Sequence, residues 1–180
     1  EKYKVPFVFA SSQMSSMSYS PYGVMKRVGE LYTESLGGKI VKFWNVYGIE
    51  NDMEKAHVIT DFIDKGFRNG VIDMMTDGTE QREFLYAEDC CEALEAVMQN
   101  YDDFTSTDPL HITSFVSTSI LEVGKIIQNL FDADGKEVKV IPAESKDTVQ
   151  KDARNQADTF ITKWWKPKTS IEEGIAKVYR

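Results

Sequence analysis

The segment Ser20–Lys26, with the sequence Ser-Pro-Tyr-Gly-Val-Met-Lys, predicts the beginning of a helix. The Ser20 hydroxyl can accept hydrogen bonds from backbone N–H groups at the helix start, and Pro21 suits the first helical position because no N–H donor is needed there. Tyr22 and Lys26 are four residues apart, so they lie one turn apart on the same face of the helix. An ammonium group near a phenol stabilises the phenolate, and such a pair is typical of an acid–base site.

The opposite side of this helix is expected to pack on a sheet. It carries an apolar stripe with helical spacing, which is typical of a helix face that covers a core. The stripe consists of Val24, Val28, Leu31 and Tyr32. The alternative interpretation is an ordinary surface helix, because a tyrosine and a lysine at this spacing occur by chance in many proteins.

The order of elements before the helix favours a functional site. Lys4–Ala10 is a short apolar run with β-forming residues, and Ser11 and Ser12 follow it. The sequence therefore predicts a strand, a serine at the carboxyl end of that strand, a loop and then the Tyr–Lys helix. In open α/β sheets, ligands bind outside the carboxyl ends of the strands. We therefore expect Ser12, Tyr22 and Lys26 to converge on one cleft.

Three further motifs follow the helix. Residues 45–48 read Asn-Val-Tyr-Gly, predicted as a turn after a strand over 39–44, and residues 77–89 read Asp-Gly-Thr-Glu-Gln-Arg-Glu-Phe-Leu-Tyr-Ala-Glu-Asp. Residues 165–175 read Trp-Lys-Pro-Lys-Thr-Ser-Ile-Glu-Glu-Gly-Ile. With the serine strand and the Tyr–Lys helix, these motifs resemble the extended short-chain dehydrogenase/reductase family, the NAD(P)-dependent nucleotide-sugar epimerases and dehydratases. The resemblance runs through nearly the whole chain but matches only the C-terminal portion of that family.

The resemblance implies a role for each of five residues. Tyr22 would move the proton of the substrate hydroxyl, Lys26 would assist it and hold the nicotinamide ribose, and Ser12 would hydrogen-bond the reacting oxygen. Asn45 and Arg82 would hold the diphosphate of a nucleotide sugar, since a guanidinium offers several donors to phosphate oxygens. Alternatively, Asn45 could be a turn residue whose side-chain amide hydrogen-bonds to its own backbone. Arg82 could be a solvated charge at the edge of a strand.

The expected fold is α/β, namely the C-terminal part of a Rossmann-like doubly wound sheet plus a small α/β substrate-binding region. Residues 1–48 would form the last strands and the catalytic helix of the nucleotide-binding domain. Residues 49–180 would form mainly the substrate-binding region, with interleaved returns to the sheet. Such a partial sheet has an unpaired edge, which is a liability unless another chain covers it. We therefore expect a homodimer or another association that covers the edge.

The resemblance also implies NAD or NADP as cofactor. In the family, a G-x-x-G-x-x-G turn holds the cofactor pyrophosphate at a helix N-terminus. None of the 11 glycines of this sequence builds that turn. The sequence begins with Glu1 rather than Met and does not resemble a signal peptide. We therefore expect a fragment or a processed product that by itself holds the cofactor poorly.

The preferred function is that of a C-terminal fragment of a nucleotide-sugar epimerase, which acts by transient oxidation of a sugar hydroxyl. Gln13 and Met14 stand where the 4,6-dehydratases have an Asp-Glu pair, so an epimerase or a reductase is favoured over a dehydratase. Lys42 stands where the family usually has Arg, which keeps the charge but loses the bidentate fork. The alternatives are a reductase or dehydratase of the same family, or a sugar-nucleotide-binding or interaction module without turnover.

Composition excludes several other classes of function. The net charge of −8 argues against nonspecific nucleic-acid binding, and no run of 18 apolar residues predicts a membrane helix. Cys90 and Cys91 are adjacent on a predicted helix, point in different directions and are not expected to crosslink anything, which favours the cytoplasm. His57 and His111 do not have metal-ligand spacing, so no metal is expected.

Overall fold

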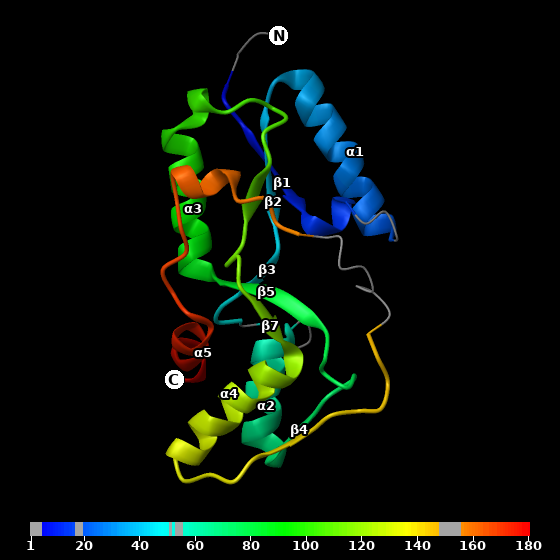
Figure 1. Ribbon diagram of the computed structural model, residues 1–180, viewed down its shortest axis with the longest axis vertical. Helices are drawn as coiled ribbons and strands as arrows, with labels where there is room; N and C mark the ends of the chain where they lie inside the picture. The colour runs from blue at the N-terminus through cyan, green and yellow to red at the C-terminus, as the bar shows by residue number, and fades with distance from the viewer. Residues whose placement is uncertain (1–4, 17–19, 51, 53–55, 148–155) are drawn as a thin grey trace.

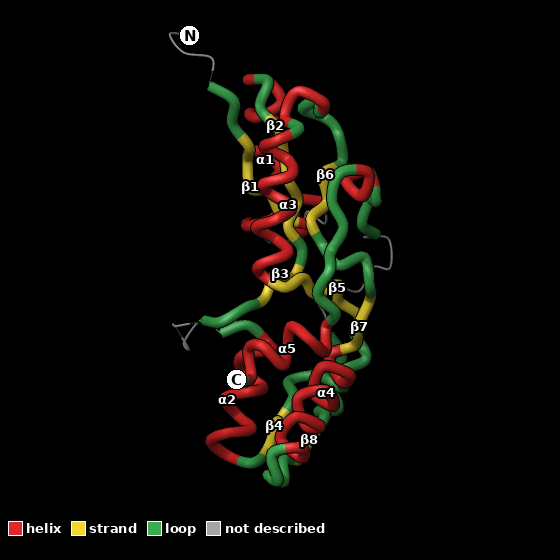
Figure 2. Tube along the Cα trace, turned by 90° about the vertical axis from the view of Figure 1, so that its left-hand side faces the viewer, coloured by secondary structure: helices red, strands yellow, loops and turns green. Residues whose placement is uncertain are grey.

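The computed structural model describes residues 5–16, 20–50, 52, 56–147 and 156–180. The molecule is elongated (Figure 1). Within the described residues, the strands form three small sheets that follow one another along the long axis (Figure 2).

Helices and strands alternate along much of the chain. The α-helices are α1 (Pro21–Leu36), α2 (Val58–Asn69), α3 (Ala87–Gln99), α4 (Ile120–Ala133) and α5 (Ile171–Tyr179). The strands are β1 (Val8–Ser12), β2 (Lys39–Phe43), β3 (Asn45–Tyr47), β4 (Val71–Asp73), β5 (Gln81–Tyr86), β6 (Leu110–Ile112), β7 (Ser117–Ser119) and β8 (Lys139–Ile141). Short 3₁₀ turns are η1 (Gln13–Ser16), η3 (Tyr101–Asp103) and η4 (Phe160–Lys163).

The first sheet has the strand order β1-β2-β6, and both of its strand pairs are parallel. The chain leaves this sheet after β2 and returns to it with β6, so that Leu110 lies opposite Val41. In Figure 1, α1 lies on one side of β1 and β2, and α3 lies on the other. Parallel strands with helices on both faces are characteristic of α/β folds. The predicted α/β class is therefore confirmed.

A compact apolar core joins the first sheet to α3 and η4. Burying a large apolar side chain contributes about 1.5–3 kcal/mol relative to leaving it exposed, so this core is a main source of stability for the sheet. Its buried members are Val41, Leu85, Cys90, Ala93, Val97, Phe104, Leu110, Ile112, Ile161 and Trp165.

A second apolar core lies in the other half of the molecule. There β5 pairs with β3 in parallel and with β7 antiparallel, while β4 and β8 form a parallel pair. Helices α2, α4 and α5 pack together around this core. A Cβ atom at Gly66 of α2 would collide with the ring of Phe131 of α4, so glycine is what permits this close approach. Other buried members of this core are Ile59, Phe62, Ile72, Ile120, Val123, Ile127 and Ile175.

The segment predicted as a turn at residues 45–48 is instead largely a strand, β3. Asn45 lies opposite Phe84 and Tyr47 lies opposite Tyr86 in a parallel pair. The physical reason is burial, because the Tyr47 ring is 4% exposed and lies 6.3 Å from the Phe84 ring in an edge-on arrangement. An extended backbone puts this ring into the core, which a tight turn would not do.

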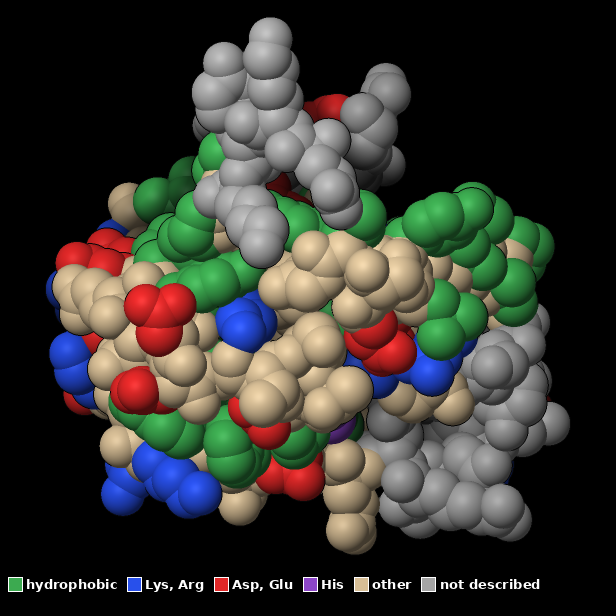
Figure 3. All heavy atoms as spheres, turned by 90° about the horizontal axis from the view of Figure 1, so that it is seen from above, with side chains coloured by type: hydrophobic (Ala, Val, Ile, Leu, Met, Phe, Trp, Pro, Cys, Tyr) green, Lys and Arg blue, Asp and Glu red, His purple; other side chains and the backbone are tan. Residues whose placement is uncertain are grey.

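The prediction for the packing face of α1 is wrong. The expected stripe of Val24, Val28, Leu31 and Tyr32 faces outward, and each of these side chains is exposed. The face against the sheet carries Gly23, Glu30 and Thr33 instead, together with Gly29. A Cβ atom at Gly29 would collide with the Phe9 ring of β1, so small residues are needed where the helix approaches the strand. Figure 3 shows hydrophobic side chains gathered on the side of the molecule that carries α1.

The helix ends follow the local signals in the sequence. Ser20 accepts a hydrogen bond from Gly23 N, and Ser119 accepts one from Glu122 N. Ser170 and Glu173 form a reciprocal capping box. None of the helices within the described residues is long and apolar enough to cross a membrane.

Candidate active site

Tyr22 and Lys26 lie on the same side of α1, as their spacing predicts. Lys26 Nζ is 5.6 Å from the centre of the Tyr22 ring. It also donates a 2.7 Å hydrogen bond to the carbonyl oxygen of Ala10 in β1. The Tyr22 side chain is 55% exposed. The first turns of α1 therefore hold an accessible phenol and an anchored ammonium group near the carboxyl end of β1.

Ser12 is the last residue of β1 and lies close to the start of α1. Its Oγ accepts a 3.2 Å hydrogen bond from Met14 N in η1. The carbonyl oxygen of Met14 approaches Gly23 so closely that a Cβ atom there would collide with it. Glycine next to Tyr22 thus allows the turn that follows Ser12 to rest against the beginning of the Tyr–Lys helix.

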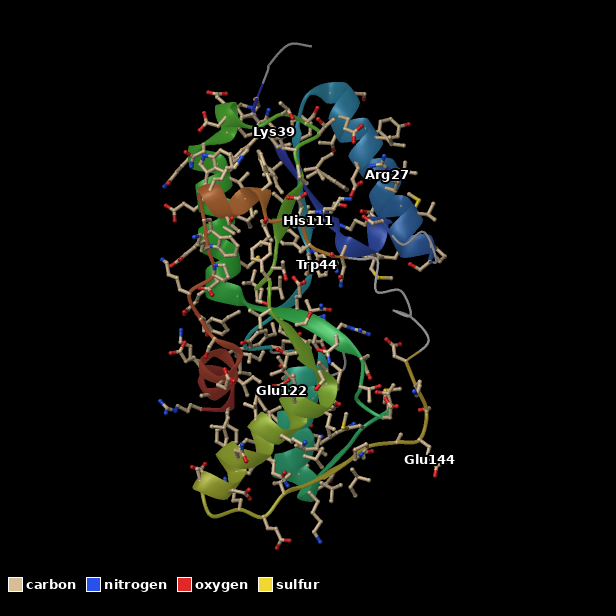
Figure 4. The ribbon with its side chains drawn as sticks, in the orientation of Figure 1. Arg27, Lys39, Trp44, His111, Glu122 and Glu144 are labelled. Carbon is tan, nitrogen blue, oxygen red and sulfur yellow. The ribbon has the colours of Figure 1, made fainter. Side chains whose placement is uncertain are left out.

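Ser12 also lines a small pocket of about 240 Å³ at the ends of β1 and β2. The same pocket is lined by Trp44 and Asn45, and by Val58 of α2. Figure 4 shows Trp44 and His111 near the centre of the molecule, and their rings are 6.0 Å apart. Tyr22 and Lys26, both in the described part of the chain, do not line this pocket.

Asn45 and Arg82 share a second, larger pocket of about 610 Å³. Asn45 Nδ2 donates a 3.3 Å hydrogen bond to the carbonyl oxygen of Glu83. Arg82 Nη1 donates to the carbonyl oxygen of Gln81, and Arg82 Nη2 forms an ion pair with Asp147. Asn45 lines both pockets, so the pocket of Ser12 and the pocket of Arg82 are neighbours.

The larger pocket combines cationic and acidic groups. Lys65 lines it, and the pKa of Lys65 is raised because hydrogen bonds and charge from Asp61 and Asp73 outweigh the opposing effect of burial. The lining also includes the apolar side chains of Phe62 and Phe84. Arginine and lysine donors in the same pocket as apolar rings suit a ligand with both phosphate groups and a ring.

Glu30 is a site residue that sequence reasoning missed. Its carboxylate is 1% exposed, yet it accepts 2.5 Å hydrogen bonds from the hydroxyls of Ser11 and Ser15 and a 2.8 Å hydrogen bond from Arg27 Nη1. Burial opposes its ionisation, but these hydrogen bonds and the charge of Lys42 outweigh burial and lower the pKa of Glu30. The local sequence does not mark Glu30, because the groups that bury and pair it come from β1, η1 and β2.

Asp89, the last residue of the 77–89 motif, and the two histidines make contacts that connect elements of the fold. Asp89 accepts hydrogen bonds from the backbone N–H groups of Lys168 and Thr169, at 3.0 and 2.8 Å, and ties α3 to the segment before α5. His57 is at the N-cap position of α2 and pairs with Glu50. His111 accepts a 3.0 Å hydrogen bond from Asp158 N.

Residues 148–155 of the polar stretch 143–156 lie outside the described residues. Within the described residues, no group of three or more His, Cys, Asp or Glu side chains could hold a metal ion.

Comparison with known proteins identifies relatives for most of the chain. GDP-L-fucose synthase of Sinorhizobium fredii is 27% identical over 171 residues, and a putative UDP-glucose 4-epimerase of Methanocaldococcus jannaschii is 30% identical over 167 residues. Each match covers 88% of this chain and 52% of the relative. The chain therefore spans about half the length of these curated relatives.

Solved structures share the fold. UDP-glucose 4-epimerase of Thermotoga maritima superposes with a TM-score of 0.75 at 22% identity, covering 97% of this chain and 62% of that structure. UDP-glucuronic acid 4-epimerase of Bacillus cereus gives a TM-score of 0.77 at 19% identity, covering 97% and 60%. Residues 5–112 match a family model. On this match, which takes in β1, the Tyr–Lys helix and both predicted substrate-binding residues, the chain belongs to the NAD dependent epimerase/dehydratase family.

Proposed function

We propose that this chain is the C-terminal part of a cytoplasmic, NAD(P)-dependent nucleotide-sugar epimerase. The observation that carries the proposal is the Tyr22–Lys26 pair beside the end of β1. Lys26 Nζ donates a hydrogen bond to the carbonyl oxygen of Ala10, which attaches the pair to this strand. Membership of the epimerase/dehydratase family supports an acid–base role for this pair. The free thiols of Cys90 and Cys91 support the cytoplasmic assignment.

Three side chains of this chain act at the reacting hydroxyl. Tyr22 takes the hydroxyl proton when the sugar carbon is oxidised and returns a proton when the carbonyl is reduced. Lys26, whose Nζ lies 5.6 Å from the centre of the Tyr22 ring, assists Tyr22 in this proton transfer and holds the nicotinamide ribose. Ser12 donates a hydrogen bond to the reacting oxygen.

The residues present fit the nicotinamide end of NAD(P). Tyr22 is exposed, and Lys26 has donors beyond the one that it gives to Ala10, since an ammonium group has three. A bound nicotinamide cofactor would supply the acceptance and return of hydride at the sugar carbon. The sequence has no G-x-x-G-x-x-G segment, so we assign the pyrophosphate to a part of the parent protein other than these 180 residues.

Asn45 and Arg82 are proposed to bind the nucleotide diphosphate in the larger pocket. The solved epimerase of Thermotoga maritima is described with UDP-glucose, and that of Bacillus cereus with a UDP-sugar and NAD. The Arg82 guanidinium already pairs with one anionic group, the carboxylate of Asp147. This ion pair supports the assignment of Arg82 to an anion-binding site.

We further propose that residues 1–48 belong to the nucleotide-binding domain of the parent and residues 49–180 mainly to its substrate-binding region. Within the described residues, β1 pairs only with β2, so its other edge is open. A homodimer, or association with another chain, would cover this edge. The exposed apolar side chains of α1 support such an association.

The test uses the intact parent and the 180-residue chain side by side. Mass spectrometry and absorbance measure the retained nicotinamide cofactor, and proton NMR follows UDP-glucose for inversion at a sugar carbon. We expect the parent to retain the cofactor and interconvert the sugar, and the 180-residue chain to do neither. A parent that binds UDP-glucose without converting it would favour the binding-module alternative.

A further inference from the structure

Glu30 is a fully buried carboxylate in the third turn of α1. It lies on the same helix face as Tyr22 and Lys26, at successive spacings of four residues. Taking a carboxylate out of water is costly unless the charge is paired and hydrogen-bonded. Glu30 meets this condition, because it accepts hydrogen bonds from Ser11 Oγ, Ser15 Oγ and Arg27 Nη1. It also forms an ion pair with Lys42 Nζ at 3.4 Å.

The two serine donors lie on either side of Ser12 in the chain. Ser11 is in β1 immediately before Ser12, and Ser15 is in η1 three residues after it. Both hydroxyls donate to the same oxygen, Oε1, of Glu30. The segment that carries Ser12 is therefore attached to α1 at two points, one before and one after the serine.

Other contacts attach the same segment to neighbouring elements. Lys42 of β2, which is 3.4 Å from Glu30 Oε1, donates a 3.1 Å hydrogen bond to Ser16 Oγ at the end of η1. Arg27 Nη1, one turn earlier in α1, donates a 2.8 Å hydrogen bond to the other carboxylate oxygen, Oε2. Both carboxylate oxygens are thus fixed, so Glu30 has one orientation in which it can hold both serines.

We propose that Glu30 is a positioning residue that sets Ser12 relative to Tyr22 and Lys26. This inference rests on the proposed function for its catalytic consequence. Ser12 and the Tyr–Lys pair come from different elements, a strand end and a helix, and their relative placement has to be fixed by contacts between those elements. Glu30 provides such a contact from the helix that carries Tyr22 and Lys26.

The expected effect of Glu30 is on the rate of reaction rather than on substrate binding. The Glu30 partners are near Ser12, whereas Asn45 and Arg82 bind the proposed diphosphate from other strands. A displacement of about 1 Å at a reacting group can cost about 100-fold in rate. We therefore expect Glu30→Gln to lower kcat of the parent enzyme by about 10- to 100-fold and to leave KM for UDP-glucose unchanged.

The control is Glu34→Gln, one turn further along α1. Glu34 is an acid near the same arginine, with Oε1 3.8 Å from Arg27 Nη1, but its side chain is 31% exposed. This variant removes the same charge from the same helix, and we expect kcat to stay at the wild-type value. The variant Ser15→Ala removes one of the two serine donors and keeps the carboxylate, so it provides a milder second test if Glu30→Gln does not fold.

A double-mutant cycle with Ser12→Ala separates positioning from a general loss of stability. If Glu30 acts through Ser12, Glu30→Gln should lower kcat no further in the Ser12→Ala background. Hydrogen exchange of the 180-residue chain gives a readout that does not need activity. The Met14 amide donates to Ser12 Oγ, so it should exchange faster in Glu30→Gln than in Glu34→Gln.

Each outcome decides one of the two proposals. A parent protein without any turnover contradicts the proposed function, and the exchange of the Met14 amide then still tests whether Glu30 fixes the Ser12 segment. An active parent in which Glu30→Gln keeps the wild-type kcat, or loses activity equally with and without Ser12, overturns the positioning role. Unchanged exchange of the Met14 amide overturns it as well.

Discussion

Arg82 and Asp147 form an ion pair inside the larger pocket although 65 positions separate them in the sequence. Their side chains are only 14% and 13% exposed, so solvent screens the pair less than it would at the surface. The guanidinium that we assign to the substrate diphosphate is therefore already occupied by a carboxylate. An incoming phosphate has to displace Asp147 or bind beside it.

Arg82→Ala in the parent should weaken binding of UDP-glucose by about 1.5–3 kcal/mol, the range for hydrogen bonds to charged groups. Arg82→Lys should restore only part of the affinity, because lysine lacks the planar fork. Calorimetric titration measures both variants. Arg68→Ala is the matched control, since Arg68 pairs with Asp64 at the surface of α2. Equal affinity of Arg82→Ala and the wild type would leave Arg82 without a role in binding.

Asp147→Asn should tighten the binding of UDP-glucose. The substitution removes a negative charge that competes with phosphate for Arg82, while it keeps the size of the side chain. The same titration measures the change, with Glu144→Gln on the same loop as a control because the Glu144 side chain is outside the lining of this pocket. Weaker binding would mean that Asp147 orients Arg82 rather than competing with the ligand.

Tyr22→Phe in the parent should lower turnover by about two to four orders of magnitude, the usual contribution of a positioned acid or base. The fold should change little, because the Tyr22 side chain is more than half exposed. Steady-state kinetics measures the loss of turnover, and thermal unfolding measures whether the fold has changed. Tyr32→Phe removes a hydroxyl from the outer face of the same helix and should leave turnover unchanged. Near-normal activity of Tyr22→Phe would refute the acid–base assignment.

Asp89→Ala should lower the free energy of unfolding by about 1–3 kcal/mol. Asp89 is 3% exposed, and its removal leaves the N–H groups of Lys168 and Thr169 without their acceptor. Urea unfolding of the 180-residue chain measures the loss. The neighbouring Glu88→Ala removes an exposed ion pair with Lys177 and should lower the free energy of unfolding much less than Asp89→Ala does. Similar losses in both variants would show that the Asp89 hydrogen bonds contribute little.

The lowered pKa of Glu30 predicts an acid-sensitive component of stability. Its folded-state pKa lies below the ordinary value of 4.5, so the unfolded chain binds a proton more readily than the folded one. The stabilisation is complete above pH 4.5 and is lost as the pH falls through the folded-state pKa. Urea unfolding across this range should therefore show a shallower decline for Glu30→Gln than for the wild type. Parallel curves for the two proteins would contradict the prediction.

Much of the fold could be predicted from local signals. Ser20, Pro21 and Gly37 mark the two ends of α1, and the capping box at Ser170 marks the start of α5. These signals act between residues a few positions apart, so a single sequence contains all of the information needed. The same holds for the one-turn spacing of Tyr22 and Lys26.

The misassigned features depend on partners far away in the sequence. The inner face of α1 is set by the Phe9 ring against Gly29, and a helical pattern of apolar residues does not show that small residues are needed there. Glu30 looks like a surface acid until Ser11 and Lys42 are placed next to it. The strand at residues 45–47 depends on pairing with residues 84–86.

The return of β6 to the first sheet has a consequence for folding. Residues 44–109, which build much of the second core, separate β2 from the strand that completes its sheet. Contacts between residues this far apart in the sequence have a high entropic cost of loop closure, and they slow folding to the native topology. On the ribosome, β1, α1 and β2 emerge before either β6 or the aromatic side chains of η4 are available to cover them. We expect this early segment to stay protease-sensitive until the chain has emerged as far as Trp165, the last buried member of the first core in the sequence.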